Sequence, residues 1–572
     1  MAGAREVVTV QLGPYAGCVG AHWWALQESS FSSDPATARS DETLHHNVLF
    51  RPGRSSQGQE TYTPRLILMD LKGNLGCLKQ EGTLYHDTNT DTPVAWKGAL
   101  TTHREDPSPV HPFLKGLGGS EDNRSSGSGF SPRTLPGDAE RRNETPETLP
   151  SETTAHVWSD FLRTSLHPRT TFAIQQYSHE GDSSQLEAFG QGEKLLQSAA
   201  YAEELEDRLH FYVEECDYLQ GFQVLCDLHS GFSGIGAKLT ELLQDEYAGK
   251  GVLTWGVAPT HKSAVPQKNF YRLMNTVLGM VSLSSHSSLL CPLSLNGSLG
   301  LRTEPPATLP YLRYDASLDY HTSAILATAL ETLTVPYRLQ ASTISMANLA
   351  EALNFSGRKV AASMAAVPFP VMRGQSLPDA LCSQQLAAPW SSMSSCGEQS
   401  KSHCFAQSVV LRGISKEYQV SRPPSGTEPK SVLHMCDTGQ EVLARYLYMA
   451  SPRTFSTSHL LQSPTRLLAP YPQYFSPLLN KQGLLLEKPP LHTSAAVESI
   501  PVFTALQSSA VLRRTLGNLY EELHQVDVRR WASFFSAGVE SDDFQEALEE
   551  LRTLSHCYRH SDAAEDSEDD LD

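Results

Sequence analysis

Residues 203–257 read EELEDRLHFYVEECDYLQGFQVLCDLHSGFSGIGAKLTELLQDEYAGKGVLTWGV, and this stretch decides the fold class. Leu205, Leu209 and Val213 recur every four residues, a spacing that places apolar side chains on one face of a helix. Glycine is common just past the end of a helix, so we expect Gly221 to end this one. The first third of the stretch is therefore predicted to be an amphipathic helix.

The remainder of the stretch alternates short apolar runs with glycine. Residues 222–228 are mostly apolar and have the length of a buried strand. Residues 231–236 are a glycine-rich turn, Leu239 lies near the start of a second helix, and residues 252–257 are a further strand. Helix, strand, glycine turn, helix and strand in this order predict an α/β nucleotide fold.

Three interpretations of the glycine turn compete. A Walker-type phosphate loop requires G-x4-G-K-[ST]; Gly231 and Gly236 have that spacing, but Lys238 comes one place late. A dinucleotide loop requires G-x-G-x-x-G, whereas the order here is G-x-x-G-x-G, and residues 252–257 do not end in an acidic residue. The third interpretation is a tight turn between a strand and a helix that binds no ligand, and the residues alone favour it.

The surroundings of the turn resemble the tubulin/FtsZ family, and tubulin most closely. Residues 215–223, ECDYLQGFQ, are similar to the corner that precedes the phosphate loop of tubulin, and VLTWGV at 252–257 is similar to the strand that follows it. The glycine turn stands where tubulin carries G-G-G-T-G-[ST]-G, although His229 and Phe232 replace small residues. The resemblance thus implies a vestigial phosphate loop made of Gly231, Ser233, Gly234 and Gly236.

The N-terminus resembles the first strand and first nucleotide loop of tubulin. Residues 5–13 alternate as a strand does and run into a loop at residues 14–20 and a helix that opens at Ala21. Gly13 and Gly20 fit the tubulin pattern and are implied as further cofactor-binding residues. Pro14 removes a backbone donor where tubulin has Gln, so the contact loop is altered.

A third match lies at residues 62–71, which resemble the tubulin strand that ends in the second nucleotide loop. Asp70 fits that loop and completes the set of implied cofactor-binding residues. Lys72 stands where tubulin has an acidic residue near the metal, and a cation does not hold magnesium. We therefore expect no metal, and no cofactor beyond weak binding of GTP or GDP.

Composition narrows the class of protein. The chain has 572 residues, a net charge of −19 and a pI near 5.5, which argues against a nucleic-acid partner. Ten scattered Cys without a C-x-x-C pair suit a reducing compartment and indicate no zinc site. Residues 273–301 carry no Asp, Glu, Lys or Arg and are long enough for a membrane span, but seven Ser, His286 and Pro292 indicate a buried globular core instead. No signal-peptide core precedes the first strand.

Four regions are expected along the chain. Residues 1–300 should form a tubulin-like, Rossmann-like domain with a disordered insertion at 106–154, which is rich in Ser, Gly, Pro, Glu and Arg. Residues 301–504 should form a second α/β domain with long Pro- and Ser-rich loops. Residues 505–560 should form C-terminal helices, and 561–572 an acidic, solvated tail.

The tubulin-like first strand, the long insertion followed by a helix at Trp158, and the strand at 63–71 resemble the Misato family. This resemblance implies a role in mitochondrial distribution and morphology, in the cytoplasm and peripherally at the cytosolic face of the mitochondrial outer membrane. It implies protein partners there, and tubulin or the tubulin-folding chaperonin as further candidates.

Two functional classes remain open from the sequence. One is a non-enzymatic tubulin-like adaptor, and the other is a polymerising GTPase or a microtubule and spindle assembly factor. In tubulin-type proteins an acidic residue of the second domain activates water, but residues 352–378 contain no Asp or Glu. The altered loops and this acid-free interval favour the first class, with no catalytic residue.

Overall fold

The computed structural model describes residues 5–31, 44–54, 60–75, 157–178, 185–261, 263–340, 342, 344–383, 389–397, 402–421, 429–489, 496–526 and 528–560. The predicted insertion at 106–154 and the acidic tail at 561–572 lie outside the described residues.

A six-stranded parallel sheet forms the centre of the first half of the chain. Its residues are almost all buried, because helices cover both faces, and its strands are accordingly apolar. The strands in spatial order are β5 (Thr171–Ile174), β4 (Leu66–Leu71), β1 (Glu6–Leu12), β6 (Leu219–Asp227), β7 (Gly251–Val257) and β8 (Leu289–Leu293).

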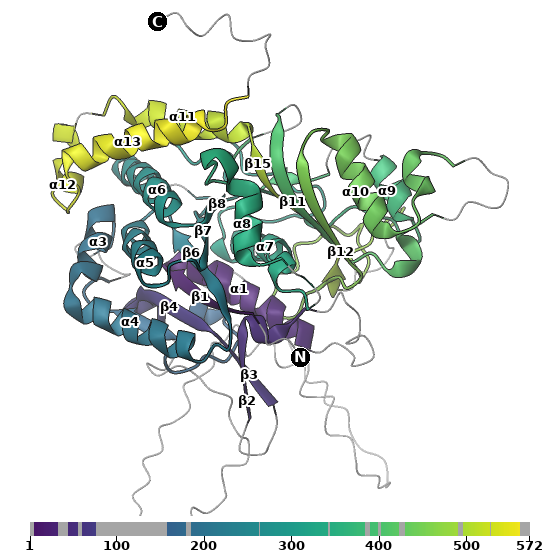
Figure 1. Ribbon diagram of the computed structural model, residues 1–572, viewed down its shortest axis with the longest axis horizontal. Coiled ribbons are helices and arrows are strands. Elements are labelled where there is room, and N and C mark those ends of the chain that lie inside the picture. Colours follow the sequence, from purple (N-terminus) through teal and green to yellow (C-terminus); the bar gives the residue numbers. More distant parts are fainter. Residues whose placement is uncertain are drawn as a thin grey trace, which may run out of the picture.

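Two sets of helices pack on this sheet, each around its own apolar cluster. One set consists of α1 (Pro14–Phe31), α7 (Asp319–Leu333) and α8 (Met346–Asn354). The other consists of α3 (Phe189–Gln197), α4 (Ala199–Glu214), α5 (Phe232–Glu246) and α6 (Pro266–His286). The C-terminal helices α11 (Val511–Leu523), α12 (Ala532–Phe535) and α13 (Ser541–His556) form a further layer beside α6 (Figure 1).

A second, five-stranded sheet follows, in the order β10 (Ser391–Ser392), β9 (Ala362–Ala366), β15 (Val502–Ser509), β11 (Cys404–Arg412) and β12 (Phe455–Leu461). It is mixed: β11 and β12 are parallel, and β15 is antiparallel to both β9 and β11. Helix α10 (Gly439–Ala450) packs on β12, next to α9 (Leu377–Ser383). Helix α7 contacts α1 and also the second sheet, and every residue from Tyr320 to its end is buried, so it joins the two halves.

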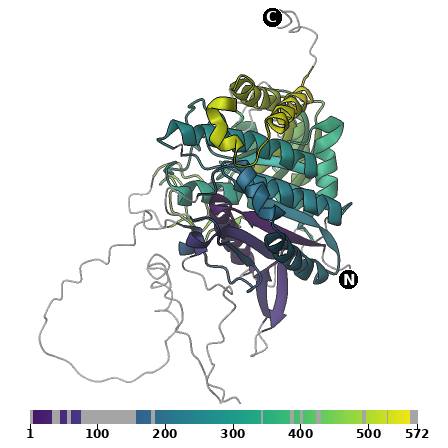
Figure 2. The ribbon, with the colours of Figure 1, turned by 90° about the vertical axis from the view of Figure 1, so that its left-hand side faces the viewer.

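Two short ribbons complete the described strands. They are β2 (Phe50–Arg54) with β3 (Glu60–Pro64), and β13 (Thr465–Arg466) with β14 (Ser499–Ile500). The C-terminal helices lie at the opposite end of the molecule from the β2–β3 ribbon (Figures 1 and 2). The α/β class predicted from the sequence is confirmed.

Several predicted boundaries are wrong. Helix α4 ends at Glu214, and Gly221 lies inside β6, where a side chain would collide with the backbone of Gly251 on β7. The predicted helix at Trp158 is a single 3-10 turn over Trp158–Asp160. The boundary at 504/505 cuts β15, and the C-terminal helices begin at Val511, because the apolar run before it pairs with β9 and β11.

The uncharged stretch at 273–301 is part of the globular core, as predicted. It supplies most of α6 and all of β8, and its side chains are largely buried through Leu295. Among the described residues we find no helix whose length and apolar character would let it cross a bilayer.

Candidate functional site

The order of the first sheet fixes where a ligand crevice is expected. From β1 the chain adds β4 and β5 on one side, then returns to add β6, β7 and β8 on the other. In sheets of this type, ligands bind outside the carboxyl ends of the strands where the direction reverses. Here that point lies between the ends of β1 and β6, which lead to Gly13 and Asp227.

The side chain of Asp227 lies at this point and contacts the start of α1. Its carboxylate is completely buried and accepts hydrogen bonds from the backbone N–H groups of Ala16, at 2.7 Å, and Tyr15, at 3.2 Å. Both amides belong to the first turn of α1, where free N–H groups and the helix dipole attract an anion. The carboxylate of Asp227 thus occupies the position in which a bound phosphate would find these donors.

Gly13 is the residue that lets Asp227 come so close. Its φ is +104°, and a Cβ atom there would lie 2.6 Å from Oδ2 of Asp227. Burial raises the pKa of Asp227 well above its usual value, and the two amides oppose that rise because they stabilise the charged form. The nearby carboxylates of Asp70 and Asp319 add to the rise.

The predicted glycine turn is helical. Residues 232–236 are the first turns of α5, and Gly231 is its N-cap. The N–H of Gly231 donates to the carbonyl of Leu186 at 3.1 Å, and a side chain at Gly234 would collide with the carbonyl oxygen of Phe189. The close backbone approach that glycine permits is therefore used by α3, which packs directly against α5.

The other implied residues of this loop are also engaged inside the protein. Ser233 is fully buried, and its hydroxyl donates to the carbonyl of Ser230 at 2.7 Å. A Cβ atom at Gly236 would lie 2.6 Å from Sγ of Cys226 on β6. These positions let α5 pack tightly on the sheet.

Asp70 stands at the end of β4 and is completely buried. Its carboxylate accepts hydrogen bonds from the indole Nε1–H of Trp158 at 2.7 Å, from Nδ2 of Asn74 at 2.9 Å and from the N–H of Leu71 at 2.7 Å. Burial raises the pKa of Asp70 to about 6, although the three donors oppose the rise.

Trp158 covers the first turn of α1. A Cβ atom at Gly17 would lie 2.5 Å from Cδ1 of Trp158, so the indole rests directly on the helix. We did not predict this role from the sequence; the signal was a Trp at the point where an ordered pattern resumes after the insertion. Trp158 and Asp227 thus approach the same helix start, where the resemblance predicts the phosphate of a nucleotide.

The structure brings together part of the predicted site. Gly13 lies against Asp227, and the carboxylates of Asp70 and Asp227 are close enough to affect each other. Gly20 lies inside α1, where a side chain would collide with that of Gln11 on β1. Nucleotide binding by Gly13, Gly20, Asp70, Gly231, Ser233, Gly234 and Gly236 stays a prediction.

The acid-free interval at 352–378 runs from the end of α8 past β9 to the start of α9. Glu351, one residue before the interval, lies on α8 with an exposed side chain. It is the carboxylate nearest the start of the interval, and any search for activation of water should include it.

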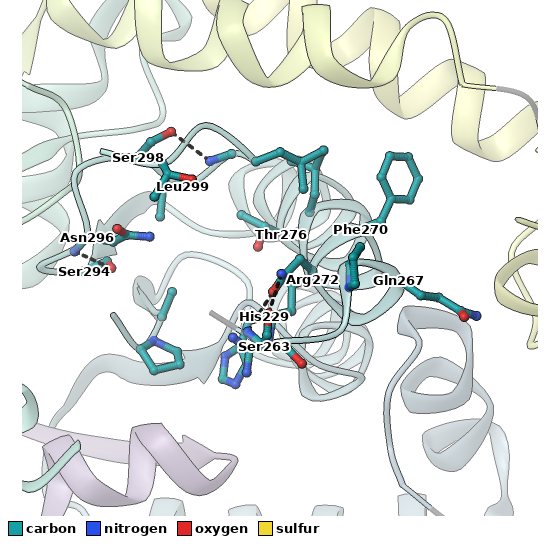
Figure 3. A pocket seen from close by; sticks show the side chains of 18 of the residues that line it. His229, Ser263, Gln267, Phe270, Arg272, Thr276, Ser294, Asn296, Ser298 and Leu299 are labelled. Atoms are coloured by element: carbon teal, nitrogen blue, oxygen red, sulfur yellow. Dashed lines mark hydrogen bonds between the residues drawn. The ribbon is translucent and has the colours of Figure 1, made fainter. Parts of the chain in front are cut away.

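An open pocket lies beyond the ends of β7 and β8, with a volume of about 1040 Å³ (Figure 3). It is lined by the chain after β7 and β8, by the first turns of α6, and by Gln525, Val526, Arg530 and Trp531 before α12. Ser294, the nearest counterpart of the guanine-reading Asn of tubulin, lies in its wall and is almost fully buried. None of the seven predicted cofactor-binding residues lines it.

Comparisons with known proteins agree on one family. A model described as "Misato Segment II tubulin-like domain" matches residues 5–118, and one described as "Tubulin domain" matches residues 146–339. "Protein misato homolog 1" of Mus musculus is 54% identical and covers 98% of this chain and 99% of its own. The Danio rerio protein of that name is 45% identical with complete coverage of both chains. "Protein misato" of Drosophila melanogaster is 30% identical over 97% of this chain and 99% of its own. The predicted tubulin/FtsZ-like fold is confirmed.

Proposed function

The chain belongs to the Misato family of tubulin-like proteins, and from that premise we propose that it binds other proteins, without turning over nucleotide, in the distribution and morphology of mitochondria. The mitochondrial part of this proposal rests on the family resemblance. The part about nucleotide rests on one observation, the buried carboxylate of Asp227 on the amides of Tyr15 and Ala16.

The hydrogen bonds of Asp227 explain why that observation disfavours a nucleotide. A phosphate placed at the start of α1 would have to displace the carboxyl group of Asp227, which already accepts hydrogen bonds from the amides of Tyr15 and Ala16. Asp70 stands close by and adds negative charge wherever it is ionised. At the start of α5, the N–H of Gly231 already has a carbonyl partner. A phosphate would therefore have to displace groups of the chain itself at both helix starts.

The proposed location is the cytoplasm and the cytosolic face of the mitochondrial outer membrane, through a protein receptor. A net charge of −19 opposes adsorption to anionic lipid. Tubulin and the tubulin-folding chaperonin are further proposed partners. Protease treatment of intact mitochondria should digest the bound protein completely, and high salt or carbonate should release it. A protease-protected or carbonate-resistant fraction would refute peripheral attachment.

The test of the non-enzymatic role combines turnover and rescue. Steady-state GTP hydrolysis by the purified full chain, with and without tubulin, should be absent or residual, and Glu351→Gln should leave it unchanged. In cells depleted of the protein, whose mitochondrial network should fragment or cluster, the native chain and Glu351→Gln should rescue equally well. Because Glu351 is exposed, this variant is expected to fold normally.

Two results would contradict the proposal. One is a GTP turnover comparable to that of tubulin, and its loss in Glu351→Gln would assign the activation of water to that residue. The other is a failure of Glu351→Gln to rescue the network while it accumulates to the native level. Either would favour the alternative, a polymerising tubulin-like GTPase.

A further inference from the structure

The open pocket beyond β7 and β8 differs in charge from the rest of the chain. The protein carries a net charge of −19, yet none of the described residues that line the pocket is acidic. Two arginines, Arg272 and Arg530, contribute to the lining, together with amide and hydroxyl side chains. The described lining of this pocket is therefore cationic and rich in hydrogen-bonding groups, although the protein as a whole is acidic.

Arg272 lines this pocket and has no ion-pair partner among the described residues. It projects from α6 into the pocket wall, and its Nη1 group donates to the carbonyl of His261 at 2.8 Å. Burial lowers its pKa, and Asp319 and Asp227 counteract this only through space, since no carboxylate among the described residues forms an ion pair with it. Asp319 instead pairs with His261, at 3.3 Å between Nδ1 and Oδ1. A half-buried cation without an ion pair favours an anion beside it.

The start of α6 adds to the positive potential at the same place. This helix has 21 residues and begins at Pro266, and its first turn lines the pocket. The positive end of its dipole attracts negative charge. His229, in the same wall, has a buried Nδ1 atom with no hydrogen-bond partner among the described residues. Burial lowers its pKa well below the usual value, so at neutral pH it is an uncharged donor or acceptor.

The remaining walls suit a polar body larger than a lone ion. Ser294 and Asn296 lie across the pocket from Arg272 and His229 (Figure 3). Phe270 and Trp531 stack at 4.1 Å with an angle of 10° between their planes and form a flat apolar side. A volume of about 1040 Å³ matches pockets that hold small organic molecules.

We propose that this pocket binds a small polar molecule through a phosphate or carboxylate group that pairs with Arg272. The planar guanidinium fork matches either group in a two-point contact, and the start of α6 supports the same charge. The polar side chains of Ser294, Asn296 and His229 bind the body of the molecule. This site is separate from the crevice filled by Asp227 and goes beyond the proposed function.

The test uses inorganic phosphate and citrate as probes on the purified full chain. Isothermal calorimetry and thermal unfolding should detect at least one of them with a dissociation constant in the millimolar range or below. Arg272→Gln should weaken binding at least about tenfold, a loss typical of one charged contact. The matched control is Arg445→Gln, which removes an exposed arginine on α10 and should bind as the native chain does.

The two probes distinguish the two kinds of anion, because a phosphate ester site should prefer phosphate and a carboxylate site citrate. Circular dichroism checks that Arg272→Gln is folded. If it is not, Arg530→Gln serves instead, since this arginine is exposed at the pocket and should weaken binding two- to threefold, by about 0.5 kcal/mol. Equal affinity in the native chain and the folded pocket variant would overturn the proposal. So would binding of neither probe up to about 50 mM.

Discussion

Two regions at the carboxyl ends of the strands in the first sheet differ in how the donor groups at a helix start are satisfied. Between β1 and β6 the amides of α1 meet the buried carboxylate of Asp227, and the start of α5 meets the backbone of α3. Beyond β7 and β8 the start of α6 and Arg272 face an open pocket without a carboxylate in its described lining. In the first region a carboxyl group of the chain itself accepts from the amides of α1. In the second region no such group of the described lining faces Arg272, and for this reason we propose a ligand there.

The filled crevice should be far more sensitive to substitution than the open pocket, and Trp158→Ala should show the largest effect. Trp158 is buried, rests on Gly17 and donates to Asp70. Its removal leaves a cavity and a buried carboxylate with one donor fewer, which should lower the free energy of unfolding by about 4 kcal/mol. Urea unfolding of the full chain measures this. A loss under about 1 kcal/mol would show that the crevice is loosely packed.

Asp70 should make stability depend on pH. Its pKa is 3.8 in the unfolded chain and about 6 in the folded one. Between about pH 4 and pH 6 the folded chain therefore holds a proton that the unfolded chain has lost, and stability falls as the pH rises through this window. The fall should be about 3 kcal/mol, and it should be complete above the folded pKa.

Asp70→Asn isolates this contribution, because Asn does not titrate and Asp227 remains in both chains. Urea unfolding at a series of pH values should show the native chain losing more stability toward neutral pH than the variant does. Parallel curves for the two chains would mean that water reaches Asp70.

Gly234→Ala probes the contact between α3 and α5. A methyl group at this position would collide with the carbonyl oxygen of Phe189, which should cost about 2 kcal/mol. Gly517→Ala on α11 is the matched control, because a Cβ atom there would have Ser555 Oγ as its neighbour at 3.6 Å. The control should stabilise the chain by about 0.5–1 kcal/mol. Thermal unfolding of both variants should give shifts of opposite sign, and shifts of the same sign would refute the close contact.

The open pocket should tolerate substitution. Arg530→Gln changes an exposed side chain on its rim, so stability should change by less than about 0.5 kcal/mol. The same unfolding measurement serves here. A loss of stability as large as that of Trp158→Ala would mean that Arg530 belongs to the structural core, and it would contradict the expected difference between the two regions.

Local pattern predicted the elements better than it predicted their contacts. The apolar runs at 252–257 and 5–13 gave strands β7 and β1, because burial on both faces leaves a clear signal. The glycines at 231–236 predicted a turn, but they form the start of α5. Their small size lets the backbone of α3 pack against this helix. The contact involves a helix distant in sequence, so the local sequence pattern does not reveal it.

The candidate site stays a prediction, and the sequence did not reveal all of the groups that the structure places around it. The resemblance directed attention to Gly13 and Asp70, which do lie at the crevice. It did not single out Asp227, because a carboxylate at the end of a strand shows its role only when the start of α1 lies above it. Arg272 was missed for a similar reason, since its missing ion pair is a property of the folded chain.

The most direct test of the filled crevice is the nucleotide content of the purified full-length protein. Denaturation followed by mass spectrometry of the supernatant should release no stoichiometric GTP or GDP from the native chain, because the groups that would hold the phosphates already bind Asp227 and Leu186. Arg272→Gln should give the same result; nucleotide released by the native chain but not by this variant would come from the open pocket. Stoichiometric guanine nucleotide from both chains would contradict the account.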